Sequence, residues 1–336
     1  MIIPEIRIVN SASCSFKTDD YTSVKHMYLV FSLFTGLLIA LMVQVNGLLQ
    51  GAAGVLPALL MIHGVGLVSS FLFLCGKKAF RKSEPSKRQP GQPAPGHRRF
   101  PFWGIIAGVL GVGVVFLNNE VFLRGGVLLT LSGTLAGQTL AASSLELLSI
   151  FKERSAPVLQ RILSPILIIP GTVLIAVKSG ISFGWGLLAV LPGILLMVQG
   201  AMNSKLSVRL DTPKMLILNY GSAVTALALL ILAAGSITSV FDSTGWGDIP
   251  VYLFFGGGIL GMIVIAVSSF LFTRTSLLQV VLGLYIGQIG LGLVLDLLAG
   301  RGIVIEKIIG IVLLICGLLS GKISKRDDRM ARKQNT

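Results

Sequence analysis

Long apolar segments are the feature that most constrains how this chain can fold. Its 336 residues contain ten stretches of about 20 predominantly apolar residues, the length that spans a bilayer as an α-helix. Most are apolar all round rather than along one face, which is typical of helices that contact both lipid and other helices. The sequence predicts an all-α integral membrane protein with ten transmembrane helices, at about residues 28–49, 57–76, 101–118, 126–149, 162–178, 184–203, 214–236, 251–271, 275–299 and 306–321.

The composition agrees with this class and argues against two others. Hydrophobic residues make up 53% of the chain and charged residues only 12%, against about 25% charged residues in an ordinary soluble domain. The formal net charge is +14, but the basic residues form short clusters between apolar runs rather than one solvated basic face. We therefore expect neither a soluble single-core enzyme nor a protein that binds nucleic acid.

The basic residues instead predict the topology. An even number of spans places both termini on one side of the membrane. With that side cytoplasmic, 24 of the 28 Lys and Arg residues lie on it, and the four opposite are Arg124, Lys178, Arg301 and Lys307. This asymmetry follows the positive-inside rule, so we expect a multi-pass protein with cytoplasmic termini.

The expected organisation has four parts. Residues 1–27 form a polar N-terminal extension, residues 28–180 a first five-helix unit, residues 181–325 a second, and residues 326–336 a basic cytoplasmic tail. A basic, proline-rich loop at 77–100 interrupts the first unit. Translation could start at Met1 or at Met27, which directly precedes the first span, and N-terminal sequencing would decide between them.

An internal repeat relates the two units. At an offset of 150 residues, a G-x-x-x-G-Q pattern recurs and is followed eight residues later by a carboxylate. The pattern comprises Gly133, Gly137, Gln138 and Glu146, then Gly283, Gly287, Gln288 and Asp296; Gly108/Gly258, Gly111/Gly261, Phe122/Phe272 and Arg124/Arg274 also coincide. With small gaps, Asn46 aligns with Asn203, Pro57 with Pro213 and His63 with Asn219.

The number of helices in each unit predicts how the units are related. Five is odd, so the second unit starts on the opposite side of the membrane from the first. The two units are therefore expected to be inverted, related by a pseudo-two-fold axis in the membrane plane. This architecture is typical of secondary transporters, which bind solute near the midplane and open alternately to either face.

These motifs resemble a known family. The segments "GLLIALMVQVNGLLQ", "HGVG", "WGIIAGVLGV" and "LAGQTL" are similar to a five-helix unit of the YdcZ type, and "LLMVQGAMNSKL", "FGGGILG" and "LYIGQIG" repeat it. YdcZ proteins are a branch of the drug/metabolite transporter (DMT) superfamily, related to EamA-like exporters. The resemblance covers residues 27 to about 325. It implies a bacterial inner-membrane exporter made of two fused units, and it supplies no substrate.

Polar residues within the predicted helices are the candidate substrate pathway, since such groups are costly in lipid and usually face the bundle interior. Gln138 and Gln288 lie about midway along their helices, where they either line a central site or form an interhelical hydrogen bond. Gln44, Asn46, Gln199 and Asn203 lie toward the ends of their helices and are candidates for substrate contact, with helix capping as the alternative for Asn46 and Asn203. The first unit departs from the second here, because Met42 stands where the Gln199/Asn203 spacing would place a glutamine.

The ionisable candidates have two interpretations each. Glu146 and Asp296 lie about 12 Å beyond the glutamines, close to opposite membrane faces, at about 1.5 Å per residue. They either couple transport to protons or are interfacial carboxylates paired with a base such as Arg154 or Arg301. His63 carries a proton or serves as a packing residue, and its aligned partner Asn219 cannot titrate.

The remaining motifs predict packing rather than chemistry. We expect close helix contacts at Gly108, Gly111, Gly133, Gly137, Gly258, Gly261, Gly283 and Gly287. The three cysteines are isolated in sequence, and the chain has neither a Walker phosphate loop nor an HExxH motif. We therefore expect no catalytic residues, no metal site and no cofactor.

Together these features predict a secondary transporter, an exporter of an unidentified small metabolite or drug-like solute. The alternative is a permease-like or scaffold subunit that needs a separate energising partner. The expected partners are the lipid bilayer and a small-molecule solute, with ion or proton coupling and a homodimer left open.

Overall fold

The computed structural model describes residues 18–81, 102–153, 158–235, 246–274, 277–302 and 304–334. Within these ranges the regular structure is helical, with no strand, which confirms the predicted all-α class. The helices are α1 (Thr18–Ala53), α2 (Val55–Arg81), α3 (Trp103–Glu153), α4 (Val158–Lys178), α5 (Phe183–Leu188), α6 (Leu191–Leu210), α7 (Thr212–Ala233), α9 (Val251–Arg274), α10 (Leu277–Leu298) and α11 (Ile305–Gln334), with a 3-10 turn η1 (Trp246–Asp248).

Six helical segments of the described chain are long and apolar enough to cross a membrane. They are Met27–Ala53, Val55–Ala79, Trp103–Ala141, Gly184–Leu210, Thr212–Ala233 and Val251–Leu271, and Ile166–Lys178 and Leu282–Leu298 are shorter apolar helices. A multi-pass membrane protein is confirmed, but the predicted count of ten spans is not. One reason is that the third and fourth predicted spans form a single helix, α3.

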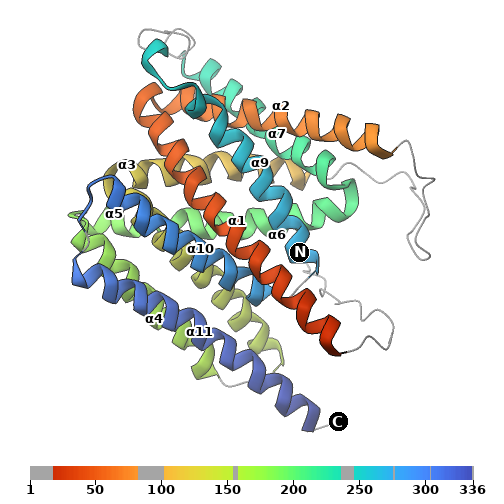
Figure 1. Cartoon of the computed structure of the whole chain (residues 1–336), viewed down its shortest axis with the longest axis vertical. Helices are drawn as coiled ribbons and strands as arrows, with labels where there is room; N and C mark the ends of the chain where they lie inside the picture. Colours follow the sequence, from red (N-terminus) through yellow and green to blue (C-terminus); the bar gives the residue numbers. More distant parts are fainter. Residues whose placement is uncertain are drawn as a thin grey trace.

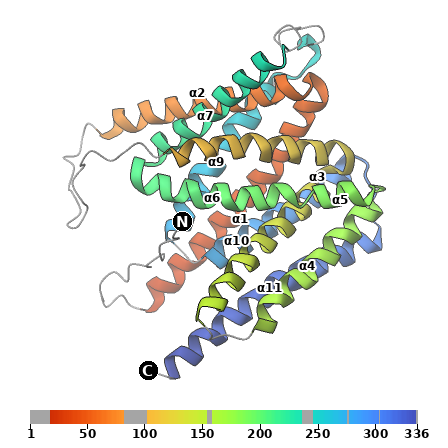
Figure 2. The ribbon, with the colours of Figure 1, turned by 180° about the vertical axis from the view of Figure 1, so that it is seen from behind.

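Helix α3 is sharply kinked at Gly126 (φ 82°, ψ −173°), and its two parts run in different directions (Figure 2). A positive φ is accessible to glycine at little cost because glycine has no Cβ. In the second unit, the position at an offset of 150 is residue 276, which lies outside the described residues, between Arg274 of α9 and Leu277 of α10.

The helices pair across the two units in a regular way. Helix α1 packs against α10, and α6 packs against α3. Helix α2 packs against α9, as α7 does against α3. At opposite edges of the bundle, α2 lies beside α7 and α4 beside α11 (Figure 1). The first turns of α1 and the last turns of α11 lie at the same end of the bundle (Figure 1).

Glycines bring these pairs into backbone contact. A Cβ added to Gly36 on α1 would collide with the carbonyl oxygen of Leu284 on α10. A Cβ added to Gly193 on α6 would collide with the carbonyl oxygen of Thr134 on α3. Gly36 and Gly193 are 157 residues apart and Thr134 and Leu284 are 150 apart, so the repeat makes the same contact twice.

The predicted packing glycines lie at the same interfaces. Gly283 and Gly287 face α1, and Gly133 and Gly137 face the junction of α5 and α6. Gly258 contacts the backbone of α2 at Ile62 and Gly66, and Gly108 contacts that of α7 at Asn219 and Ala223.

The register of these contacts corrects one aligned pair. Gly258 contacts Ile62 and the equivalent Gly108 contacts Asn219, so Ile62 and Asn219 are equivalent positions in the repeat. His63 therefore corresponds to Tyr220 and not to Asn219. The shift of one residue arises because Pro57 and Pro213 sit at slightly different positions within the first turns of α2 and α7. The sequence alone does not locate a one-residue gap in the alignment of the two units when the gap falls at the start of a helix.

Gly137→Ala is expected to lower the free energy of unfolding by about 1–3 kcal/mol, because the added methyl meets the backbone of Val190 and Gly193 and the helices must separate. Thermal melting of the detergent-solubilised protein measures the change. Gly200→Ala is the matched control, since in the described part of the chain no atom beyond the neighbouring backbone of α6 lies within 4 Å of its added Cβ. Equal melting temperatures for the two variants would show that the α3–α6 contact is not close-packed.

Candidate functional site

Buried amides of α6 and α7 form a hydrogen bond in the interior of the second unit. Asn219 Nδ2 donates to Asn203 Oδ1 at 2.8 Å, and both side chains are buried. One turn earlier on α6, the amide of the buried Gln199 lies against Gly111 of α3. Asn203 is seven residues from the end of α6, so it is an interhelical residue rather than a helix cap.

The corresponding place in the first unit carries different polar groups. Gly261 of α9 faces the hydroxyl of Tyr220 and the sulfur of Met42, and Asn46 of α1 lies against Gly257. Asn46 is 3% exposed, and its Oδ1 has no hydrogen-bond partner among the residues that the structure describes. The physical reason is that Ile62 occupies the place that Asn219 holds in the second unit. Gln44 is half-buried on α1 and is not brought to the α9 glycines, where Met42 stands instead.

An aromatic pair lies between α2 and α7. The rings of His63 and Tyr220 are edge-on, with centroids 6.1 Å apart. His63 Nδ1 lies 2.9 Å from the carbonyl oxygen of Leu59, and because a carbonyl only accepts, Nδ1 carries the proton. This bond to its own helix is the one expected of a packing histidine.

The repeated glutamines lie near the contact of α3 with α10. Tyr285 OH donates to Gln138 Oε1 at 2.9 Å, which joins the two units. Gln288 is buried on α10, three residues beyond Tyr285. Gln138 therefore makes the interhelical bond that was one of its two predicted roles.

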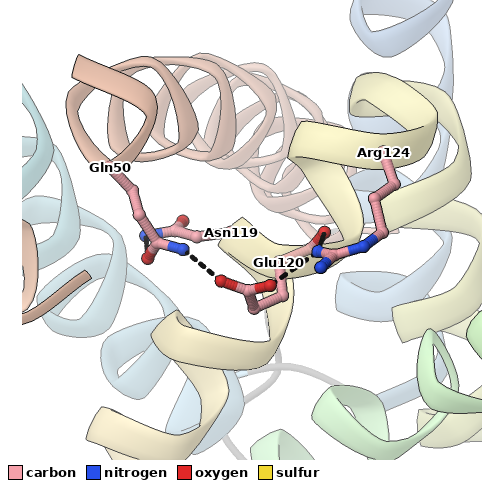
Figure 3. Close-up of polar contacts among 4 residues, drawn as sticks. All are labelled: Gln50, Asn119, Glu120 and Arg124. Carbon is pink, nitrogen blue, oxygen red and sulfur yellow. Dashed lines mark hydrogen bonds and ion pairs between the residues drawn. The ribbon is translucent and has the colours of Figure 1, made fainter. Parts of the chain in front are cut away.

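A polar network near the kink was not predicted from the sequence. Gln50 of α1 donates through Nε2 to Glu120 Oε1 at 2.8 Å, and Asn119 Nδ2 donates to Gln50 Oε1 at 3.0 Å (Figure 3). Arg124 forms a 2.6 Å ion pair with Glu120 Oε2. Residues 118–120 would suit a solvated helix end, but α3 continues through them, so Asn119 is buried between helices.

In the same region, Arg124 also connects the first unit with the second. The guanidinium of Arg124 lies 3.6 Å from the centre of the Trp185 ring on α5, a cation–π contact. Figure 3 shows Arg124 and Glu120 on α3 turned toward each other.

Asp296 lies directly beside the kink. It is 4% exposed and accepts hydrogen bonds from Val127 N at 2.9 Å and Leu128 N at 3.1 Å. A Cβ added to Gly126 would collide with Asp296 Oδ1 and with the guanidinium of Arg301. The carboxylate therefore lies at the start of the second part of α3 with a base close by. Glu146 lies on α3, and its side chain is outside the described residues.

Further polar contacts join the units at both ends of the bundle. Lys178 of α4 pairs with Glu306 of α11 at 2.7 Å, at the end where α10 finishes. At the other end, Lys77 of α2 pairs with Asp211 at 2.6 Å, between α6 and α7. Both bridges connect the first unit with the second.

An apolar cavity lies between α3, α4, α5 and the start of α6. Its lining includes Ala136, Ile169, Val173 and Leu187, and the hydroxyl of Thr172 donates to backbone carbonyls. None of the predicted pathway residues lines this cavity. In the described ranges, no group of three or more His, Cys, Asp or Glu residues is placed to hold a metal ion.

Comparison with known proteins gives the family. A family model described as "Putative inner membrane exporter, YdcZ" matches residues 27–174 and again residues 184–320. A search of curated proteins finds no match. A solved structure titled "Crystal structure of protein" aligns over 88% of this chain and 97% of its own, with a TM-score of 0.52 and 16% sequence identity, a likeness that shows the fold alone. The chain therefore belongs to the YdcZ family of inner-membrane exporters in the DMT superfamily, with two tandem copies of the family unit.

Proposed function

We propose that the protein is a secondary transporter that exports a small solute by alternating access between two inverted five-helix repeats. The exchanged contact of Gly36 with Leu284 and of Gly193 with Thr134 carries this proposal. Each unit places its first helix against the fourth helix of the other, as a two-fold axis between the units requires. An axis in the membrane plane lets the two units exchange conformations and open either face.

The proposed topology has ten spans, of which α3 supplies two. Its kink at Gly126 takes the place of a loop, and α5 with α6 forms the sixth span. Both termini are then cytoplasmic, because this orientation leaves only four of the 28 basic residues outside. The outer end of the bundle is the one where α10 finishes and α11 begins.

The proposed solute site lies among the buried amides and aromatic rings between the units. Its candidate residues are Gln138, Gln199, Asn203, Asn219 and Gln288 with Asn46 and His63, all of them amides apart from the histidine. Amide groups hydrogen-bond to uncharged donors and acceptors, so the site suits a neutral polar solute. Asn46 Oδ1 would gain most from a bound solute, because a buried acceptor without a partner costs about 1–3 kcal/mol. A solute N–H or O–H would satisfy it.

Transport by the chain alone is tested with purified protein in liposomes under an imposed ion or proton gradient. Candidate metabolites come from comparing solute pools inside and outside cells with and without the gene. Gradient-driven movement of a solute without other proteins is the expected result. Movement that needs an added ATPase would instead support the alternative, a permease-like subunit with a separate energising partner.

Asn46→Ala and Asn203→Ala are expected to separate solute contact from packing. Asn203→Ala breaks its bond with Asn219 and should lower the free energy of unfolding by about 0.6–2 kcal/mol. Asn46→Ala removes an acceptor with no partner, so the melting temperature should not fall, whereas solute uptake into liposomes should. A loss of stability without a change in uptake would exclude Asn46 from the solute site.

The proposed orientation is tested by thiol labelling in a variant without Cys14, Cys75 and Cys316. A membrane-impermeant maleimide added to intact cells should label Gly247→Cys, in the turn between α7 and α9. Gln92→Cys, in the basic loop, should react only after the cells are permeabilised. The reverse pattern would contradict cytoplasmic termini.

A further inference from the structure

We propose that Asp296 holds the outer end of the pathway closed by capping, from the second unit, the part of α3 that begins after Gly126. The carboxylate is thus a positioning residue of the gate rather than a proton carrier. This inference rests on the inverted repeat of the proposed function.

The cap supplies hydrogen-bond acceptors that the bilayer lacks. The first N–H groups of a helix have no partner within it, and in a membrane each must find one elsewhere. Asp296 accepts from two of them at once, Val127 N on Oδ1 and Leu128 N on Oδ2. Its negative charge also lies at the positive end of the helix dipole. When the outer end opens, water can reach these N–H groups and replace the carboxylate.

The surroundings of Asp296 are built for this contact. Gly126 leaves room for the carboxylate and for the guanidinium of Arg301, which a side chain there would displace. The backbone N–H of Arg301 donates to the carbonyl oxygen of Asp296 at 2.9 Å, so the turn after α10 holds both residues. The guanidinium also lies 5.8 Å from the centre of the Phe122 ring on α3.

The neighbouring contacts close the same end. The network of Gln50, Asn119 and Glu120 joins α1 to α3, and Arg124 on Trp185 joins α3 to α5. Asp296 adds α10. The kinked region of α3 is therefore attached to helices of both units, which is the arrangement of a closed gate.

The choice of substitution separates a cap from a proton carrier. Asparagine keeps one of the two acceptors, because its amide oxygen can replace one carboxylate oxygen while its NH2 group faces the other backbone N–H, and it cannot carry a proton at neutral pH. Leucine can do neither. A capping residue should therefore lose less with Asp296→Asn than with Asp296→Leu, whereas a proton carrier should fail with both.

The experiment measures access to the closed region. Ala40→Cys, in the variant without native cysteines, places a thiol in the fully buried cluster with Phe122, Val127 and Leu131. The rate of labelling by an impermeant maleimide from outside is expected to rise about tenfold in Asp296→Leu, since two N–H groups then lack a partner in the closed state. It should rise less in Asp296→Asn than in Asp296→Leu. The exposed Asp248→Leu is the control for loss of a surface charge.

Gly126→Ala is the second variant, because its methyl displaces the carboxylate without removing it, and it should raise labelling in the same way. Unchanged labelling in both Asp296→Leu and Gly126→Ala, with transport intact, would overturn the cap while leaving the proposed function standing. Loss of gradient-driven uptake and of its pH dependence in Asp296→Asn, with parental labelling, would establish the proton role instead. Absence of transport by the parent protein in liposomes would count against the proposed function itself.

Discussion

The absence of water from the bilayer core is the constraint on which the rest of this structure depends. Every backbone N–H and C=O at that depth needs a partner within the protein, so the spanning segments are helices and each interruption must be repaired. The interruption at Gly126 is repaired by a carboxylate from the other unit, through Val127 N and Leu128 N. The two units are therefore connected at the very point where a helix of one of them restarts.

The close contacts between helices follow from a second property of lipid. Lipid tails are as apolar as leucine, so helices associate through packing and interhelical hydrogen bonds rather than by hiding apolar surface. Glycines allow the backbones of α1 and α10, and of α6 and α3, to touch. These glycine interfaces hold the two units together and still allow the helices to slide past one another. The polar contacts at the two ends of the bundle determine which arrangement of the units is stable.

Much of the fold was predictable because the signals are local. Apolar runs gave the helices, and the repeated G-x-x-x-G-Q pattern gave the glycines that pack at the unit boundary. The sequence did not reveal that α3 continues through Gly126 as a kinked helix, since the Gly125-Gly126 pair could equally have formed a loop between two helices. The network of Gln50, Asn119 and Glu120 was missed because it joins residues about 70 positions apart, and no spacing rule connects α1 with the middle of α3.

The sequence by itself determined the membrane class, the family and the two-unit repeat, because hydropathy and repeated motifs are properties of the chain in order. The tertiary structure alone decided which polar groups meet. It placed Asp296 on the N–H groups beside Gly126, left Asn46 Oδ1 without a partner, and set His63 opposite Tyr220. The physical reason is that a hydrogen bond depends on positions within a few tenths of an ångström, and these are fixed only when helices from both units pack against each other.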